Sequence, residues 1–463
     1  MKFPIYLIIP LILAGCTHSS PNAPASESGN DEHSTDPGAT THVDSSLTKV
    51  ALHREITGVQ PGTGIVFWPD QAKANHAQYG DGISLEFSYC LPSEIVLGKQ
   101  GNQIQYNWTP FDSLLDDIAS RNHQAVIRFR YEYPSGREVD GNPGTTAVPA
   151  YIKSMNDYHE TYSENPGGDG PTWYADWSHP ELQWFTMQFY DDFAQRYQND
   201  PRIAFLEIGF GHWSEYHIYG TDLDLGRNFP SKSYQETFLR HIEETMQIPW
   251  LISIDAADDE YSPITASNEL MQLHFGLFDD SFMHEEHEIT SGDGYNERCW
   301  HALGDQRWQT SPNGGEISYY DDSDQKNFLN PEGMYGTTWE QASAKYHLSF
   351  MIANDALNGK YATPERVRTA SMKTGYAFHV TECATGNSHT ELQVCNQGIA
   401  PLYRDAWFAI GSTRSTDSLK GLLPKQCSPV SIAAELILDT DLHIISDEIL
   451  PAQTIEFSAD TTP

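Results

Sequence analysis

The stretch of sequence that decides the fold is Ile203-Ala-Phe-Leu-Glu-Ile-Gly-Phe-Gly-His-Trp-Ser-Glu-Tyr-His217. Its first six residues form a nearly continuous apolar run, which is typical of a strand buried on both faces of a parallel sheet. Two glycines, a tryptophan, two histidines and Glu215 follow the run. Carboxylates and aromatic rings at the carboxyl end of a barrel strand are typical of enzymes that cleave sugars. The stretch therefore predicts a buried strand that leads into a carbohydrate site.

Apolar, β-rich runs alternate with helical patterns along the chain, as a parallel sheet with crossover helices requires. Eight such runs occur, at residues 64–68, 83–89, 125–131, 203–210, 250–255, 271–278, 315–320 and 348–354. Eight strands close a (β/α)8 TIM barrel, so we predict this α/β fold. The long loops 134–178 and 279–311 fall after the third and sixth runs. Loops on that face of a barrel form substrate clefts.

Beyond about residue 366 the helical periods stop and alternating apolar runs are separated by short polar turns. The clearest runs are residues 376–381, 391–396 and 406–411. This pattern predicts a small C-terminal antiparallel β-sandwich.

The N-terminus resembles the signal peptide of a bacterial lipoprotein. Lys2 precedes an apolar run that is too short to span a bilayer and ends in Leu13-Ala-Gly-Cys16. In this lipobox-like motif Cys16 is expected to be acylated, with palmitate among its chains, and the following Thr17 favours the outer membrane. The predicted organisation is a signal peptide (1–16), a disordered polar tether (17–48), the barrel (49–365) and the β-sandwich (366–463).

The charge of the chain limits the partners that it can bind, and its cysteines suggest a disulfide. With 27 basic and 64 acidic residues the formal net charge is −37, which argues against nucleic-acid binding. Lipid on Cys16 is the expected membrane contact, and the sequence carries no prediction of oligomeric state. Cys383 and Cys395 flank a turn-like segment, so a hairpin disulfide between them is one possible pairing.

Three short motifs resemble a group of bacterial lipoproteins with a glycosidase-like barrel followed by a β-sandwich. They are Pro61-Gly-Thr-Gly-Ile-Val66, Gly211-His-Trp-Ser-Glu-Tyr-His217 and Asn396-Gln-Gly-Ile-Ala-Pro-Leu-Tyr403. The barrel also resembles clan A glycoside hydrolases, in which the acid/base follows strand four and the nucleophile follows strand seven. This chain departs from the clan's Asn-Glu pair, because Ser214-Glu215 stands after strand four.

Three glutamates are candidate catalytic residues. Glu215 is the predicted acid/base, because burial against Trp213 and Tyr216 would raise its pKa as a proton donor requires. Glu316, which follows two glycines and opens the seventh run, is the predicted nucleophile. Glu207 is an alternative catalyst, or a structural partner of an arginine on strand three, since a lone buried carboxylate is costly.

Further polar and aromatic residues near the predicted strand ends suit sugar hydroxyls and the apolar faces of sugar rings. The predicted substrate-binding set is Trp68, Arg128, Arg130, Glu132, His212, Trp213, His217, Asp255 and Asp280. No cofactor is expected. No catalytic metal is expected either, because neither His212 and His217 nor the histidines of segment 283–288 have the spacing of a helical zinc motif.

These features predict a retaining glycoside hydrolase that acts on a polysaccharide or oligosaccharide, such as an algal or plant glycan, at the cell surface. The alternative is a non-catalytic glycan-binding lipoprotein that retains the barrel and its aromatic residues. A third class, a metal-dependent hydrolase or lyase, would require His212, His217 or His284 to converge on one point.

Overall fold

The computed structural model describes residues 47–134, 138–139, 142–143, 146–218, 223–285, 287 and 292–462. The chain divides into Met1–Ser45 and a compact unit, Ser46–Pro463. The predicted signal peptide, Cys16 and all but the last two residues of the predicted tether lie outside the described residues. Within the described residues, no helix is both long and apolar enough to span a membrane.

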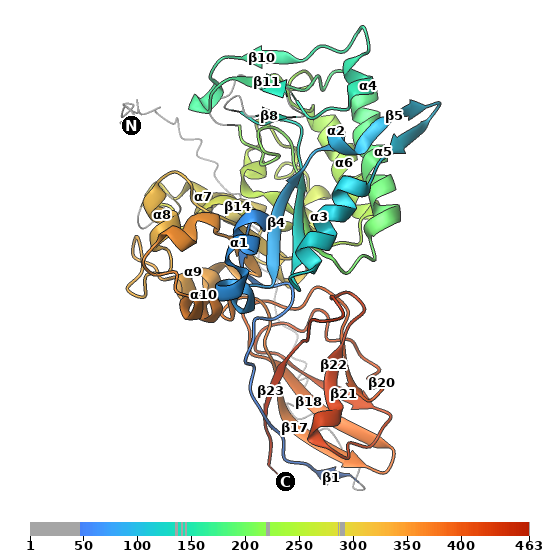
Figure 1. The fold of residues 1–463 in the computed structure, drawn as a ribbon, viewed down its shortest axis with the longest axis vertical. Coiled ribbons are helices and arrows are strands. Elements are labelled where there is room, and N and C mark those ends of the chain that lie inside the picture. The colour runs from blue at the N-terminus through green and yellow to red at the C-terminus, as the bar shows by residue number, and fades with distance from the viewer. Residues whose placement is uncertain are drawn as a thin grey trace, which may run out of the picture. The chain divides into compact units, whose positions relative to one another are not determined.

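Eight parallel strands form a closed barrel, in the order β12-β13-β14-β15-β16-β3-β4-β7. Two of them, β4 and β14, are labelled in Figure 1. In chain order the strands are β3 (Gly64–Phe67), β4 (Leu85–Cys90), β7 (Gln124–Phe129), β12 (Ile203–Glu207), β13 (Trp250–Ser253), β14 (Gly276–Phe282), β15 (Asn313–Ile317) and β16 (Phe350–Ile352). The predicted TIM barrel is confirmed, and each of the eight runs overlaps one strand.

The sixth strand differs from its predicted position. The prediction was 271–278, whereas β14 runs from Gly276 to Phe282 and Leu270–Gln272 forms a 3-10 turn. In the sequence, the adjacent Asp279 and Asp280 indicate a loop, because a carboxylate is costly to bury inside a strand. The Asp279 carboxylate is fully buried but accepts a 2.8 Å hydrogen bond from the Asn296 amide. Asp280 consequently lies within the strand rather than after it.

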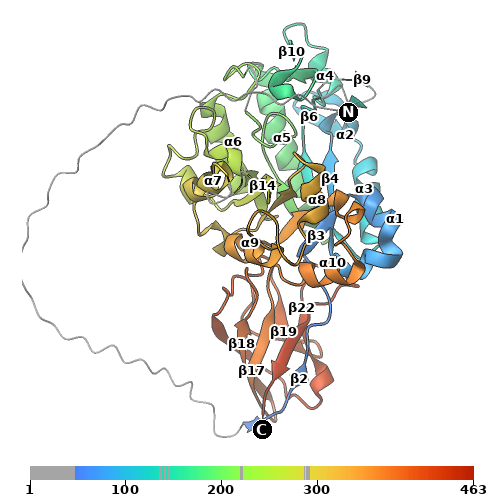
Figure 2. The same ribbon diagram turned by 90° about the vertical axis from the view of Figure 1, so that its left-hand side faces the viewer.

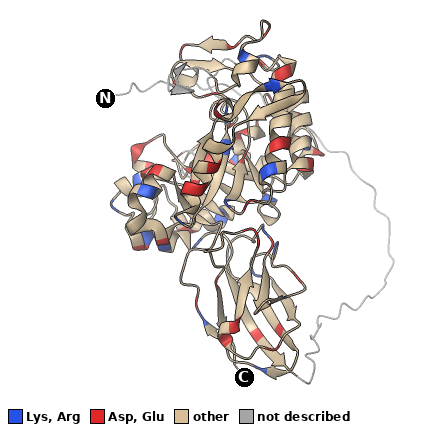
Figure 3. Cartoon of the chain, turned by 45° about the vertical axis from the view of Figure 1, so that its right-hand side comes forward, with Lys and Arg blue, Asp and Glu red and all other residues tan. Residues whose placement is uncertain are grey.

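Helices surround the barrel strands (Figure 2). They are α1 (Pro69–Tyr79), α2 (Pro92–Ile95), α3 (Thr109–Ala119), α4 (Ala150–Lys153), α5 (Pro180–Tyr197), α6 (Lys232–Thr245), α7 (Tyr295–Leu303), α8 (Asp322–Asn327), α9 (Trp339–Tyr346) and α10 (Pro364–Ser371). In α5 the residues at three- and four-residue spacing, from Leu182 to Tyr197, are buried against the strands. Acidic and basic positions lie on these helices, and acidic ones also on the C-terminal strands (Figure 3).

Shorter strand pairs decorate the loops between the barrel elements. These are β5 (Val96–Gln100) with β6 (Gln103–Tyr106), β8 (Glu138–Val139) with β9 (Asn142–Pro143), and β10 (Thr161–Ser163) with β11 (Thr172–Tyr174). The last two pairs belong to the long loop after β7.

The barrel is a filled core rather than a pore. Apolar side chains from all eight strands except β15 meet in its interior, where the rings of Phe205 and Phe350 stack with centroids 5.2 Å apart. A larger apolar cluster fills the space between the strands and the helices. Two buried layers therefore fix the strands whose ends carry the site.

Two sheets form the C-terminal part of the chain. The larger has the order β2-β23-β17-β18-β21 with β1 on β17, and the smaller has the order β20-β19-β22. Their strands are β1 (Thr48–Lys49), β2 (His53–Arg54), β17 (Phe378–Gly386), β18 (His389–Asn396), β19 (Trp407–Ile410), β20 (Thr413–Arg414), β21 (Cys427–Ile432), β22 (Leu442–Ile445) and β23 (Phe457–Asp460). Pairing is antiparallel except between β17 and β23. Both sheets contribute to one apolar core, as in a sandwich.

The barrel and the C-terminal sheets are joined by elements near residues 49 and 365, the predicted limits of the barrel domain. Residue 365 lies in α10, which packs on α1 and β3, while β1 and β2 pair with the C-terminal sheet. Arg404 is buried and donates hydrogen bonds to the carbonyls of Ile203 (2.7 Å) and Ala204 (2.8 Å), at the start of β12. The C-terminal sheets are therefore tied to the strand that leads into the predicted site.

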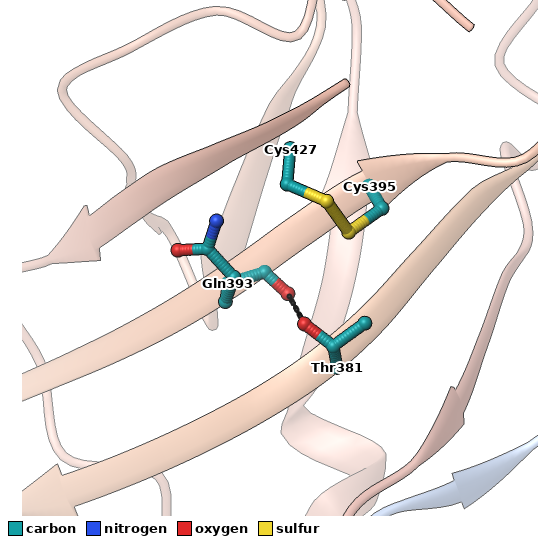
Figure 4. The surroundings of a disulfide bond; sticks show 4 residues. All are labelled: Thr381, Gln393, Cys395 and Cys427. Atoms are coloured by element: carbon teal, nitrogen blue, oxygen red, sulfur yellow. Dashed lines mark hydrogen bonds between the residues drawn. A yellow bond between two sulfur atoms is a disulfide. The ribbon is translucent and has the colours of Figure 1, made fainter. Parts of the chain in front are cut away.

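The disulfide differs from the suggested Cys383–Cys395 pairing. Cys395 is bonded to Cys427 (Figure 4), and Cys383 is buried and free. The strand register explains the difference. Cys383 of β17 lies opposite Leu392 of β18, whereas Cys395 of β18 lies opposite Cys427 of β21.

We predict that Cys427→Ser lowers the free energy of unfolding by about 3–4 kcal/mol, because the bond closes a loop of intermediate length in the unfolded chain. Cys427 is exposed, so little packing is lost with it. Cys383→Ala is the control and should cost about 1 kcal/mol for its small buried side chain. Chemical denaturation measures both variants. If both substitutions lower the free energy of unfolding equally, the disulfide adds no stability beyond side-chain packing.

Candidate active site

A cleft of about 530 Å³ opens at the carboxyl ends of the barrel strands. Its lining residues follow or end β3, β4, β7, β12, β14, β15 and β16, with one residue from the long loop after β7. They are Trp68, Tyr89, Tyr133, Asp169, Trp213, Glu215, His217, Asp280, Glu316, Tyr319, Tyr320, Asn354 and Asp355. Both predicted catalytic carboxylates therefore face one cleft.

One guanidinium lies beneath the cleft and binds three carboxylates. Arg128 of β7 donates to Glu207 through Nε (2.8 Å) and Nη2 (2.6 Å). Its Nη1 bonds Glu215, and its Nη2 also bonds Glu316 at 3.0 Å. The Tyr89 hydroxyl donates to Glu215 Oε1 at 3.0 Å. Arg128 itself is fully buried, so it positions the three acids and does not reach the cleft surface.

The loop after β12 aims Glu215 back toward the barrel axis. Three residues that flank Glu215 have left-handed backbone conformations, with φ of 54° at Trp213, 61° at Ser214 and 55° at Tyr216. Such angles are strained for these residue types and persist only where the surroundings fix them. One such contact is the 2.8 Å hydrogen bond from the Ser214 hydroxyl to the Phe129 carbonyl.

Glu316 lies near the carboxyl end of β15, because that strand begins at Asn313, two residues before the predicted run. Gly315 has φ of +141°, and a Cβ at this position would lie 2.1 Å from the Asp279 carbonyl oxygen. Only glycine permits so close an approach of β15 to β14. The glycine pair noted in the sequence therefore brings Glu316 against its neighbours.

Burial perturbs the pKa of both cleft carboxyls. Desolvation raises the pKa of Glu316 to about 7, although the Arg128 charge opposes the shift. Desolvation also raises the pKa of Glu215 well above its ordinary value, and the neighbouring Glu316 adds to the rise. Two buried acids that share one cation cannot both ionise easily, so the pair holds a proton near neutral pH.

Glu207 of β12 and the charged residues within and just after β7 lie behind the cleft. Glu207 is fully buried and is held by Arg128, as one of the two sequence interpretations proposed. The Arg130 guanidinium lies 4.3 Å from the Tyr133 ring centroid. Glu132 accepts a 3.1 Å hydrogen bond from the Ala175 amide, and burial raises its pKa to about 7. None of the four, Arg128 included, lines the cleft, so their contribution is structural or indirect.

The opposite wall of the cleft gathers acids and histidines. His217 lies between Asp169 and Asp280, and the buried Asp255 is near both His217 and Asp280. His212 is fully buried beside His217, with ring centroids 5.7 Å apart. His284 lies elsewhere, because its Nδ1 is 2.8 Å from Asp324.

Sequence reasoning missed several cleft residues. Asn354 and Asp355 follow β16, and Tyr319 and Tyr320 follow β15, so the rule that polar residues follow strand ends could have found them. Asp169 comes from the long loop after β7, where no local pattern indicates its position.

The fold and the cleft define a (β/α)8-barrel protein with a C-terminal β-sandwich and a buried carboxylate pair at the mouth of the barrel. No protein-family model and no curated protein sequence matches the chain. Similar solved structures include glycoside hydrolases, and three serve as examples. A monomeric β-xylosidase from Caulobacter crescentus CB15 is 10% identical, with 75% of each chain covered and a TM-score of 0.39. A family 39 glycoside hydrolase from Bacteroides cellulosilyticus WH2 is 8% identical, with 81% of each chain covered and a TM-score of 0.37.

The third example, a GH5 lichenase from Caldicellulosiruptor sp. F32, is 11% identical, with 66% of this chain and 82% of the lichenase covered and a TM-score of 0.36. Likeness at this level carries no argument about activity. The barrel assignment rests on the closed ring of strands itself.

We predict that Arg128→Met lowers the free energy of unfolding by about 3–5 kcal/mol at pH 7.5, since three buried carboxylates lose their cation. Their folded-state pKa values then rise further above the unfolded value of about 4.3. Between pH 4.5 and 7.5 the folded variant therefore binds more protons than its unfolded state. The loss in free energy of unfolding grows as pH rises and shrinks toward pH 4.5.

Urea denaturation across this pH range measures the effect. Arg196→Met is the matched control, because Arg196 forms a half-exposed ion pair with Asp112. Its loss should cost less than about 1 kcal/mol at every pH. If the loss of unfolding free energy in Arg128→Met is the same at every pH, Arg128 does not balance the charge of the three carboxylates.

Proposed function

We propose that this protein is a retaining glycoside hydrolase that cleaves a polysaccharide or oligosaccharide. The observation that carries the proposal is the pairing of Glu215 and Glu316 in one cleft on adjacent nitrogens of one guanidinium. A retaining pair stands ~5–5.5 Å apart, whereas an inverting pair stands ~6.5–9.5 Å apart to admit a water. A shared guanidinium favours the closer spacing.

The electrostatics support a division of roles between the two acids. The pKa of Glu215 is raised well above its ordinary value, so Glu215 holds a proton to donate to the leaving oxygen. The pKa of Glu316 rises only to about 7 and Arg128 opposes the rise, so Glu316 ionises first and attacks the anomeric carbon. In the second step Glu215 accepts a proton from the water that hydrolyses the glycosyl-enzyme.

Aromatic side chains around the acids support a sugar as the substrate. Trp68, Tyr133, Trp213, Tyr319 and Tyr320 line the same cleft, and Tyr320 is largely exposed. Flat rings pack against the CH faces of sugars, while the neighbouring Asp280 and Asn354 offer hydrogen bonds to hydroxyls. A cleft with both features fits a carbohydrate better than an apolar ligand.

We also propose that the protein acts at the outer membrane, held by lipid on Cys16. The support is the Leu13-Ala-Gly-Cys16 motif and the polar segment that follows it. Two or more acyl chains give stable anchoring without a membrane-spanning helix.

We predict that Glu215→Gln and Glu316→Gln each lower hydrolysis of a cleaved glycan by at least ~10³-fold, because an amide neither donates the proton nor attacks carbon. Azide should restore turnover to Glu316→Gln with an inverted glycosyl azide as product, since a small anion fills the place of the nucleophile. A panel of algal and plant glycans, assayed first with the wild-type protein, supplies the substrate.

Glu207→Gln is the matched control, since it removes a carboxylate from the same guanidinium but behind the cleft. It should lower stability more than turnover. Loss of turnover confined to Glu207→Gln would move the catalytic acid to the end of β12. Glycan binding without turnover in the wild-type protein would instead support a non-catalytic glycan-binding lipoprotein.

We predict a bell-shaped pH profile of kcat/KM. Activity should rise with pH through about 7 as Glu316 loses its proton, and fall at higher pH as Glu215 loses its own. Initial rates between pH 5 and about 10 measure both limbs. A profile that is already flat by pH 5 would contradict a nucleophile with a raised pKa.

A further inference from the structure

Two histidines and an aspartate converge on one point in the cleft wall. Asp169 Oδ2 lies 3.2 Å from His217 Nε2 and 3.6 Å from His212 Nδ1. The ligand-type atoms of the three residues all lie within 4.8 Å of one another. His217 belongs to a second such group with Asp255 and Asp280, so five potential ligands surround this part of the wall.

Hydrogen bonding alone accounts poorly for this arrangement. His212 Nδ1 is buried and has no hydrogen-bond partner among the described residues, and its 3.6 Å distance to Asp169 exceeds hydrogen-bond range. Atoms that share a tetrahedral metal at bond lengths of ~2.0–2.2 Å are about 3.4 Å apart. The two measured distances bracket that spacing.

The surroundings of His212 suit a metal ligand. Its Nε2 lies 3.0 Å from the Tyr174 hydroxyl, which leaves Nδ1 facing Asp169 and His217. Ligating imidazoles commonly anchor the second nitrogen in this way, because the partner fixes the tautomer and the ring orientation.

Uncompensated negative charge also favours a cation here. Asp255 is buried and Asp280 is half-buried, and both lie beside His217. Within the described residues, neither forms an ion pair with a lysine or arginine. A divalent ion beside His217 would offset this charge.

We propose that Asp169, His212 and His217 bind a divalent transition-metal ion, with zinc the best match to two imidazoles and one carboxylate. Three protein ligands leave a coordination position open. Asp169 and His217 line the cleft, so that position is available to a hydroxyl or carboxylate oxygen of a cleft ligand. The metal site does not depend on the proposed hydrolysis by Glu215 and Glu316.

The test is a calorimetric titration of the full chain with Zn²⁺ after EDTA treatment and dialysis. The expected result is one ion per chain, with an affinity that falls at least ~100-fold in Asp169→Asn and His217→Gln. Tyr174→Phe should cost ~10–100-fold, as the loss of an outer partner does. Co²⁺ should give a visible ligand-field spectrum in the wild-type protein that the two ligand variants lack.

His241→Gln is the matched control, because His241 forms a single pair with Asp191 at 2.8 Å outside any such cluster. It should bind Zn²⁺ as the wild-type protein does. Circular dichroism verifies folding, and a variant that fails to fold is replaced in the comparison by Tyr174→Phe. The proposal is overturned if the wild-type protein binds no Zn²⁺, or if binding survives the substitutions at Asp169 and His217. Because no turnover is measured, these outcomes are separate from failure of the hydrolase proposal.

Discussion

The Arg128 guanidinium is the interaction on which the rest of the site depends. Three carboxylates approach it from β12, from the loop after β12 and from β15, and each would be costly to bury alone. The rings of Phe87 and Phe278 lie 5.0 and 4.5 Å from the guanidinium carbon and enclose it within the barrel. The same charge thus allows the mouth of the barrel to hold acids and sets how readily those acids ionise.

Much of the fold could be predicted because barrel strands are buried on both faces and appear as apolar runs. The prediction was wrong where burial and polarity conflict, as at Asp279, whose hydrogen bonds permit a carboxylate inside β14. The disulfide also escaped sequence reasoning, because Cys427 is brought opposite Cys395 by a strand pairing that links distant segments. Register across a sheet is not encoded locally, so spacing along the chain could not identify it.

The site was predictable to the extent that it follows strand ends. Glu215, Glu316 and Asp280 were identified by their positions after or near apolar runs, and all three line the cleft. Asp169 was not identified, because a long loop carries it to the cleft without any periodic signal. Arg128 was identified as charged and close to the site, but its position beneath the acids depends on the packing of the whole barrel.

The pairing of β1 and β2 with the C-terminal sheet gives the sandwich a mechanical consequence. Thr48 lies opposite Thr385 of β17, and His53 lies opposite Asp460 of β23. Tension applied to the chain before residue 47 therefore loads the pairing of β1 and β2 before it reaches β3, the first barrel strand, at Gly64. If the chain is anchored through Cys16, drag from a long polymer held in the cleft acts first on the hydrogen bonds that pair β1 and β2 with the C-terminal sheet.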